Sequence, residues 1–82
     1  MSDDEIFQEL RSICARILSV DPATITRDID LRQELEADSL DMAELAAAAE
    51  DRFGLVIRLD DTSRVRTPTD VISLVRHGIN AR

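Results

Sequence analysis

Apolar residues recur at helical spacing near the start of this chain. The first stretch places five of them on one face of a 3.6-residue repeat: Ile6, Leu10, Ile13, Cys14 and Ile17. Ser2 and Glu5 precede this face with the spacing of a capping box. The pattern predicts a helix from about residue 3 to residue 19.

Residues 20–37 show no sustained period, so we expect a long loop there, with a single helical turn near residues 31–35. Four apolar residues are its expected anchors in the core: Ile25, Ile29, Leu31 and Leu35.

Helical spacing of apolar residues returns after this loop. Asp38 is a candidate N-cap, and Gly54 is suited to the left-handed end of a helix that runs through Phe53. Its expected inner stripe is Met42, Leu45, Ala46, Ala49 and Phe53.

The second half of the chain predicts one short helix and one longer helix. Residues 55–59 have some strand character but no partner strand, so we expect a connector. A short helix should begin at Asp60 or Asp61 and run through Val65. Thr67, Pro68 and Asp70 mark the start of the last helix. Its apolar stripe is Val71, Ile72, Val75 and Ile79. These elements predict an all-α fold with four helices, and we expect residues 1–82 to form a single domain.

Charge is concentrated in one part of the chain. The net charge is -7, and residues 28–51 alone hold nine acidic residues and one base, Arg32. This distribution argues against nucleic acid as a partner and favours a basic protein surface. Neither a signal peptide nor a membrane span is evident, so we expect a cytoplasmic monomer. Cys14 and His77 are each the only residue of their type, which argues against a metal site.

No pattern typical of an enzyme is present. Ser39 lacks a nucleophile elbow, and the acidic residues lie in a solvated stripe rather than an apolar pocket. Ser39 does begin a predicted helix, where free N–H groups and the helix dipole favour an attached anion such as a phosphate. The sequence therefore indicates a site of covalent modification.

The helix that starts at Ser39 also has an acidic outer face suited to docking. Asp41, Glu44, Ala48 and Asp51 are expected on this face, with Leu40, Ala43 and Ala47 beside them. A partner with basic residues around an apolar dimple would be steered to this face and would contact Leu40. An ordinary solvated helix face is the alternative interpretation.

These residues resemble the acyl carrier protein family. Ala37-Asp38-Ser39-Leu40-Asp41 matches its attachment motif, and Glu44-Leu45, Glu50 and Phe53-Gly54 stand where the family places such residues. The resemblance covers essentially the whole chain. It implies that the fold is the acyl-carrier-like four-helix bundle, and that Ser39 receives 4'-phosphopantetheine from coenzyme A through a phosphopantetheinyl transferase.

The same resemblance implies a non-catalytic carrier whose arm holds acyl thioesters. Asp38 would help the transferase complex dock. Leu40, Asp41 and Glu44 would form the recognition surface for the transferase and for acyl-loading, condensing and acyl-processing enzymes. Fatty acid, polyketide and specialised lipid biosynthesis are the candidate pathways. Alanines at 43, 46, 47 and 49 and arginines at 52, 58, 64 and 66 depart from fatty acid carriers and favour a specialised carrier.

Two alternatives stay open. A peptidyl or aminoacyl carrier would share the serine and the bundle, but it usually has Gly-Gly before Asp-Ser-Leu, where this chain has Glu36-Ala37. An acidic helical adaptor would leave Ser39 unmodified or use it as a phosphorylation site.

Overall fold

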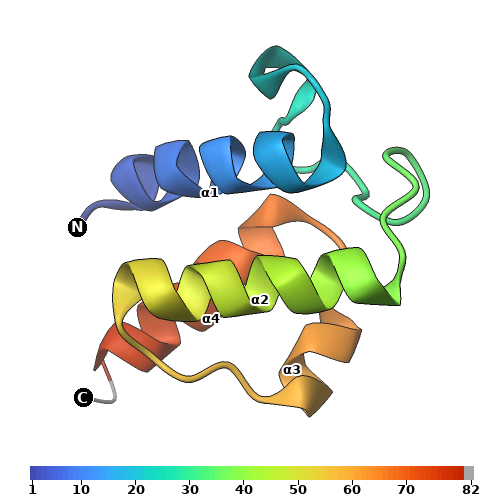
Figure 1. The fold of residues 1–82 in the computed structure, drawn as a ribbon. Helices are drawn as coiled ribbons and strands as arrows, with labels where there is room; N and C mark the ends of the chain where they lie inside the picture. Colours follow the sequence, from blue (N-terminus) through green and yellow to red (C-terminus); the bar gives the residue numbers. More distant parts are fainter. Residues whose placement is uncertain (81–82) are drawn as a thin grey trace.

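The computed structural model describes residues 1–80. They form α1 (Asp3–Leu18), a short 3₁₀ helix η1 (Pro22–Thr24), α2 (Ser39–Phe53), α3 (Leu59–Arg64) and α4 (Pro68–Asn80) (Figure 1). No strand occurs within these residues, so the predicted all-α class is confirmed. Residues 55–58 form the expected connector, although α3 begins at Leu59, slightly before the predicted Asp60 or Asp61.

Local capping groups set the ends of the two long helices α1 and α2. The Ser2 hydroxyl accepts from the Glu5 N–H, and the Glu5 carboxylate accepts from the Ser2 N–H. Helix α1 ends at Leu18, earlier than predicted, because Ser19 has a left-handed φ of 56° and its N–H bonds to the Ala15 carbonyl. Helix α2 lies between the Asp38 N-cap and Gly54, as predicted; Gly54 has a φ of 65°.

Helix α4 starts at the predicted Thr67 cap. The Thr67 hydroxyl accepts from the Asp70 N–H at 3.2 Å, and the Asp70 carboxylate accepts from the Thr67 N–H at 3.1 Å. This reciprocal pair satisfies two donors that a helix start leaves open, and Pro68 occupies the first position, where no donor is needed.

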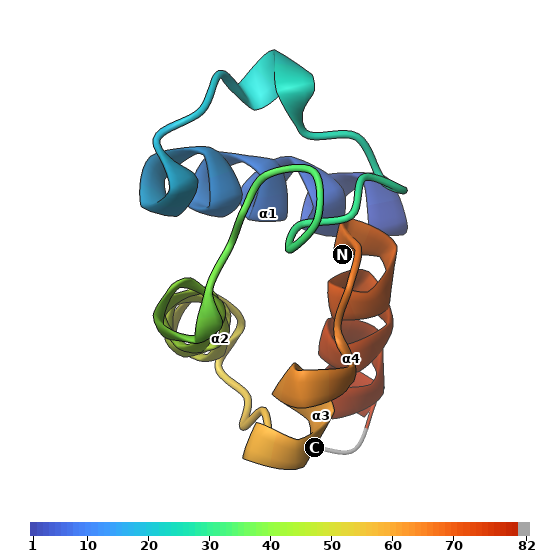
Figure 2. The same cartoon turned by 90° about the vertical axis from the view of Figure 1, so that its right-hand side faces the viewer.

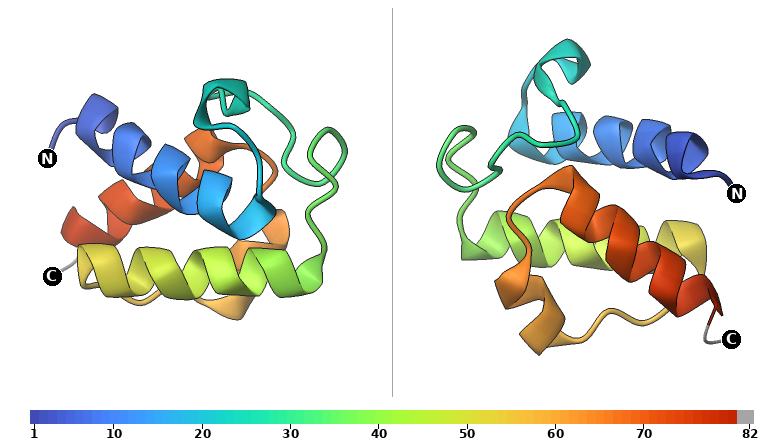
Figure 3. Two further views of the ribbon diagram at one scale, coloured as in Figure 1. Left: turned by 45° about the horizontal axis from the view of Figure 1, so that its top comes forward. Right: turned by 180° about the vertical axis from the view of Figure 1, so that it is seen from behind.

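Helix α1 is the centre of the packing. It runs opposite to α2 in Figure 1 and contacts both α2 and α4, while α3 contacts α2. The view along α2 in Figure 2 and the two views in Figure 3 show these helices enclosing one shared core. The largest side chains with no exposed surface come from three parts of the chain: Ile6, Leu10, Ile25, Leu31 and Val75.

The long loop between α1 and α2 departs from the expected secondary structure in one place. Helix η1 was not predicted; the Asp21 carboxylate caps it by accepting from the Ala23 N–H at 2.9 Å. The predicted single turn of helix is present near residues 31–35, where the Glu34 N–H donates to the Asp30 carbonyl at 2.9 Å. Of the four expected anchors, Ile25 and Leu31 are fully buried, whereas Ile29 and Leu35 are partly buried against the core.

Candidate functional site

Ser39 is the first residue of α2, and its side chain is exposed. Two residues near Ser39 cap this helix. The Asp38 carboxylate accepts from the Asp41 N–H at 2.8 Å, and the Asp41 carboxylate accepts from the Asp38 N–H at 3.1 Å. Because this reciprocal box occupies both carboxylates, the Ser39 hydroxyl is not needed to cap the helix. It lies exposed on a well-defined helix start.

The segment before Ser39 is held against the body of the protein. The Leu31 N–H donates to the Arg66 carbonyl at 2.8 Å, and the Ala37 N–H donates to the Leu31 carbonyl at 2.9 Å. Ala37 is buried beside this bond, and Glu36 adopts a left-handed φ of 58° that turns the chain into α2. These contacts fix the position of the serine relative to the core.

An open groove of about 360 Å³ lies beside Ser39, between the loop, α2 and α3. Its other lining residues mix one base, one acid, two hydroxyls and two apolar groups: Arg32, Met42, Ala43, Asp60, Thr62 and Ser63. A flexible chain attached at Ser39 could lie along this groove with both polar and apolar contacts.

The predicted outer face of α2 is divided in the structure. Leu40, with 68% of its surface exposed, lies in line with the exposed Glu44, Ala47 and Asp51. Ala43 is exposed toward the groove. Asp41 and Ala48 are half-buried, so they border the face instead of forming it.

The acids of this face are electrostatically available. Among the described residues, none of the α2 carboxylates forms an ion pair, although Asp41 completes the helix cap and Glu50 accepts from the Ile57 N–H at 2.8 Å. Glu44 and Asp51 therefore keep their charges free for a partner from outside.

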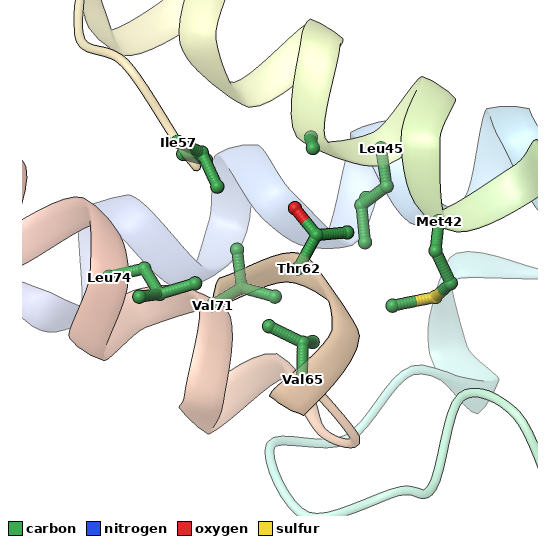
Figure 4. Close-up of a pocket in the computed structure, with 8 residues that line it drawn as sticks. Met42, Leu45, Ile57, Thr62, Val65, Val71 and Leu74 are labelled. Carbon is green, nitrogen blue, oxygen red and sulfur yellow. The ribbon is translucent and has the colours of Figure 1, made fainter. Parts of the chain in front are cut away.

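A second, apolar pocket lies beneath α2, close to the groove. Figure 4 shows Met42 and Leu45 of α2 facing Val65, Val71 and Leu74 across it, with Thr62 between Leu45 and Val65 and Ile57 at one edge. Ala46 also lines this pocket and is half-buried, whereas we predicted it in the buried stripe. The free volume is about 10 Å³, room for about one water molecule. A longer apolar group could enter only if the surrounding helices moved apart.

The remaining candidate residues stand apart from this site. Cys14 is buried in α1, and burial raises the pKa of its thiol to about 11, which keeps it protonated and unreactive at neutral pH. His77 is exposed in the last turns of α4. Within residues 1–80, no group of three or more His, Cys, Asp or Glu side chains is arranged to hold a metal ion. No helix in that range is long and apolar enough to cross a membrane.

Arg32 is the site residue that the sequence reasoning missed. It was counted as the one base of the acidic segment, yet it was not placed near Ser39. The structure brings both residues to the same groove. Its isolation among nine acids was the available signal.

Known proteins similar to this chain include acyl carrier proteins. Residues 8–75 match the family model described as a phosphopantetheine attachment site. The acyl carrier protein of Thermosynechococcus vestitus is 33% identical over 99% of this chain and 100% of its own length. That of Petrotoga mobilis is 31% identical over 98% of this chain and 94% of its own length.

A solved structure shows the same fold. The acyl carrier protein from Enterococcus faecalis superposes with a TM-score of 0.79, covering 95% of this chain and 99% of its own, at 22% sequence identity. The predicted acyl-carrier-like helical bundle is thereby confirmed.

Proposed function

Because the chain belongs to the acyl carrier protein family, we propose that residues 1–82 are one carrier domain and that Ser39 carries a covalent 4'-phosphopantetheine. The observation that carries the proposal is the exposed Ser39 at the start of α2, inside the matched region and beside an open groove. When bound, the group supplies a terminal thiol that holds an acyl chain as a thioester.

The residues around Ser39 fit the attachment of such a group. In the transfer, the Ser39 hydroxyl oxygen forms a bond to the phosphorus next to the pantetheine half of coenzyme A. Its proton would pass to a base of the transferase. The bond between that phosphorus and the bridging oxygen of the diphosphate would break, and the nucleotide half would leave with that oxygen and the bonding electron pair. The capped helix start holds Ser39 in place, and the helix dipole stabilises the charge that remains there.

The outer face of α2 is the proposed docking surface. Leu40, Glu44, Ala47 and Asp51 would contact the partner, with Asp38, Asp41 and Ala43 at its border near Ser39. The partners are the transferase and acyl-loading, condensing and acyl-processing enzymes with basic surfaces. The chain itself performs no chemistry in this role; it raises the effective concentration of the bound acyl group. The cytoplasmic location and the monomeric state expected from the sequence stay predictions.

The pathway served by the carrier belongs to the same proposal. We favour polyketide or specialised lipid synthesis over fatty acid synthesis, because small alanines line α2 where larger aliphatics are usual. The names of the relatives support an acyl over a peptidyl carrier.

Incubation with coenzyme A, magnesium and a broad-specificity phosphopantetheinyl transferase tests the attachment. The intact mass should rise by one phosphopantetheinyl group. Ser39→Ala should abolish the gain, whereas Ser63→Ala, in the same groove, should retain it. The number of thiols that react with Ellman's reagent under native conditions should rise from none to one, because Cys14 is buried. An unchanged mass, or a gain that persists in Ser39→Ala, would overturn the proposal and favour an unmodified adaptor.

A further inference from the structure

A negative group at Ser39 would enter an already acidic environment. Residues 28–51 have a net charge of -8, and a phosphodiester on Ser39 would add one more negative charge. Like charges at close range raise the free energy of the folded state. A nearby cation would offset this repulsion, and Arg32 is the one base within the segment.

The backbone of Leu31 and Arg32 is held in place by hydrogen bonds. Leu31 is fully buried and its N–H donates to the Arg66 carbonyl. The Arg32 N–H donates to the Asp30 carboxylate at 3.0 Å. From this fixed position the side chain of Arg32 lines the groove on which Ser39 opens.

The guanidinium of Arg32 is not engaged elsewhere in the described part of the chain. Four other arginines pair with carboxylates: Arg27, Arg52, Arg66 and Arg76. Arg32 is half-buried, yet its guanidinium makes no ion pair or hydrogen bond among residues 1–80. Arg11 also lacks a carboxylate partner there, but its side chain donates to the Ile25 carbonyl at 3.2 Å. Arg16, Arg58 and Arg64 lack one too, but they are exposed and none lines this groove.

We infer that the Arg32 guanidinium pairs with the phosphodiester on Ser39 and sets the direction in which the arm leaves the helix. This inference rests on the proposed function. The planar fork of an arginine matches two phosphate oxygens at once. Asp60 of α3 also lines the groove and would repel the phosphate. Attraction by Arg32 and repulsion by Asp60 together favour an arm that leaves Ser39 toward the loop.

NMR of the wild-type protein before and after modification tests the pair directly. Intact mass first establishes that the phosphopantetheinyl group is attached. The side-chain N–H resonance of Arg32 should then shift on modification, while that of Arg64, an exposed arginine of α3, should not. If Arg32 does not shift, or if Arg64 shifts equally, the inference is wrong although the carrier function stands. If no mass is gained, both fail.

Melting temperatures provide an independent measurement. The holo-minus-apo difference in melting temperature should become more negative by about 2–4 °C in Arg32→Gln, since the phosphate then lacks its counter-charge. Arg64→Gln removes one positive charge as well and should leave this difference unchanged. Equal differences in the wild type and Arg32→Gln would overturn the inference. The NMR comparison needs no variant, so it decides the matter even if Arg32→Gln does not fold.

Discussion

Helices α1 and α2 carry the same number of acidic residues but use them differently. Each has four. In α1, Asp3, Asp4 and Glu9 pair with arginines from α4, the loop and α2, and Glu5 closes the capping box. In α2, no acid pairs with an arginine of the described chain. Three acids of α1 thus link this helix to other parts of the chain, whereas Glu44 and Asp51 of α2 are exposed and form no ion pair within residues 1–80.

The apolar residues divide in the same way. Helix α1 buries Ile6, Phe7 and Leu10. Helix α2 also buries Met42, Leu45 and Phe53 on its inner side, but its outer side exposes Leu40, Ala43 and Ala47. An exposed leucine on an acidic ridge stabilises nothing in the isolated protein. This difference indicates that α1 has a structural role and that the ridge of α2 has a binding role.

The largest expected effect is on the free energy of unfolding, and it should differ sharply between a buried leucine of α1 and an exposed leucine of α2. Leu10→Ala, with no exposed surface in α1, should lower the free energy of unfolding by about 2–5 kcal/mol because it leaves a cavity. Leu40→Ala should change it by less than about 0.5 kcal/mol but should slow modification of Ser39. Urea denaturation and transferase kinetics measure the two effects. A strongly destabilised Leu40→Ala would break the comparison.

A charge reversal should affect partner recognition on α2 only. Glu44→Lys should lower kcat/KM of the transferase by about tenfold, since it places a positive charge against a basic partner surface. Asp4→Lys makes the same change on α1. It should leave kcat/KM unchanged and slightly lower the stability through loss of the Arg27 pair. Equal kinetic effects of both variants would show that general charge, not the α2 ridge, guides docking.

Removing the cap of α2 should have a moderate effect on stability. Asp38→Ala should lower the free energy of unfolding by about 1 kcal/mol, because the Asp41 N–H loses its acceptor. Asp38→Ser keeps an oxygen acceptor and should therefore retain most of the wild-type free energy of unfolding. Thermal unfolding of apo protein measures both. An Asp38→Ala variant as stable as the wild type would show that this box does not hold the helix start.

The smallest expected effect concerns pH. Hydrogen bonding to Arg52 lowers the pKa of Glu9, and hydrogen bonding to Arg76 lowers that of Asp3. Lowered carboxyl pKa values stabilise the fold above the ordinary values of 4.5 and 3.8, and this stabilisation is lost as the pH falls through the folded values. In Glu9→Gln, the free energy of unfolding should therefore fall less steeply as the pH decreases. Because the Glu9–Arg52 pair is exposed, high salt should reduce the difference in acid stability between the wild type and Glu9→Gln. If the stability of Glu9→Gln falls with pH as steeply as that of the wild type, the pair does not have this role.

Local features of the chain were predictable, and the long-range contacts were not. The caps at Ser2, Asp38 and Thr67 and the end at Gly54 follow from nearest neighbours, so the sequence located them within one or two residues. Helix η1 was missed although Asp21-Pro22 is a suitable helix start, because the loop was judged only by its lack of period. The bond from Leu31 to Arg66 joins segments far apart in sequence. It positions Arg32 in the groove, and the isolation of this one base among nine acids does not by itself predict that placement.

The most direct test is fragmentation mass spectrometry of the protein isolated from its own cells. The account predicts that a phosphopantetheinyl group is found on the peptide containing Ser39, at that serine, with or without an acyl thioester. Protein that is entirely unmodified at Ser39, or that carries the group on another residue, would contradict it.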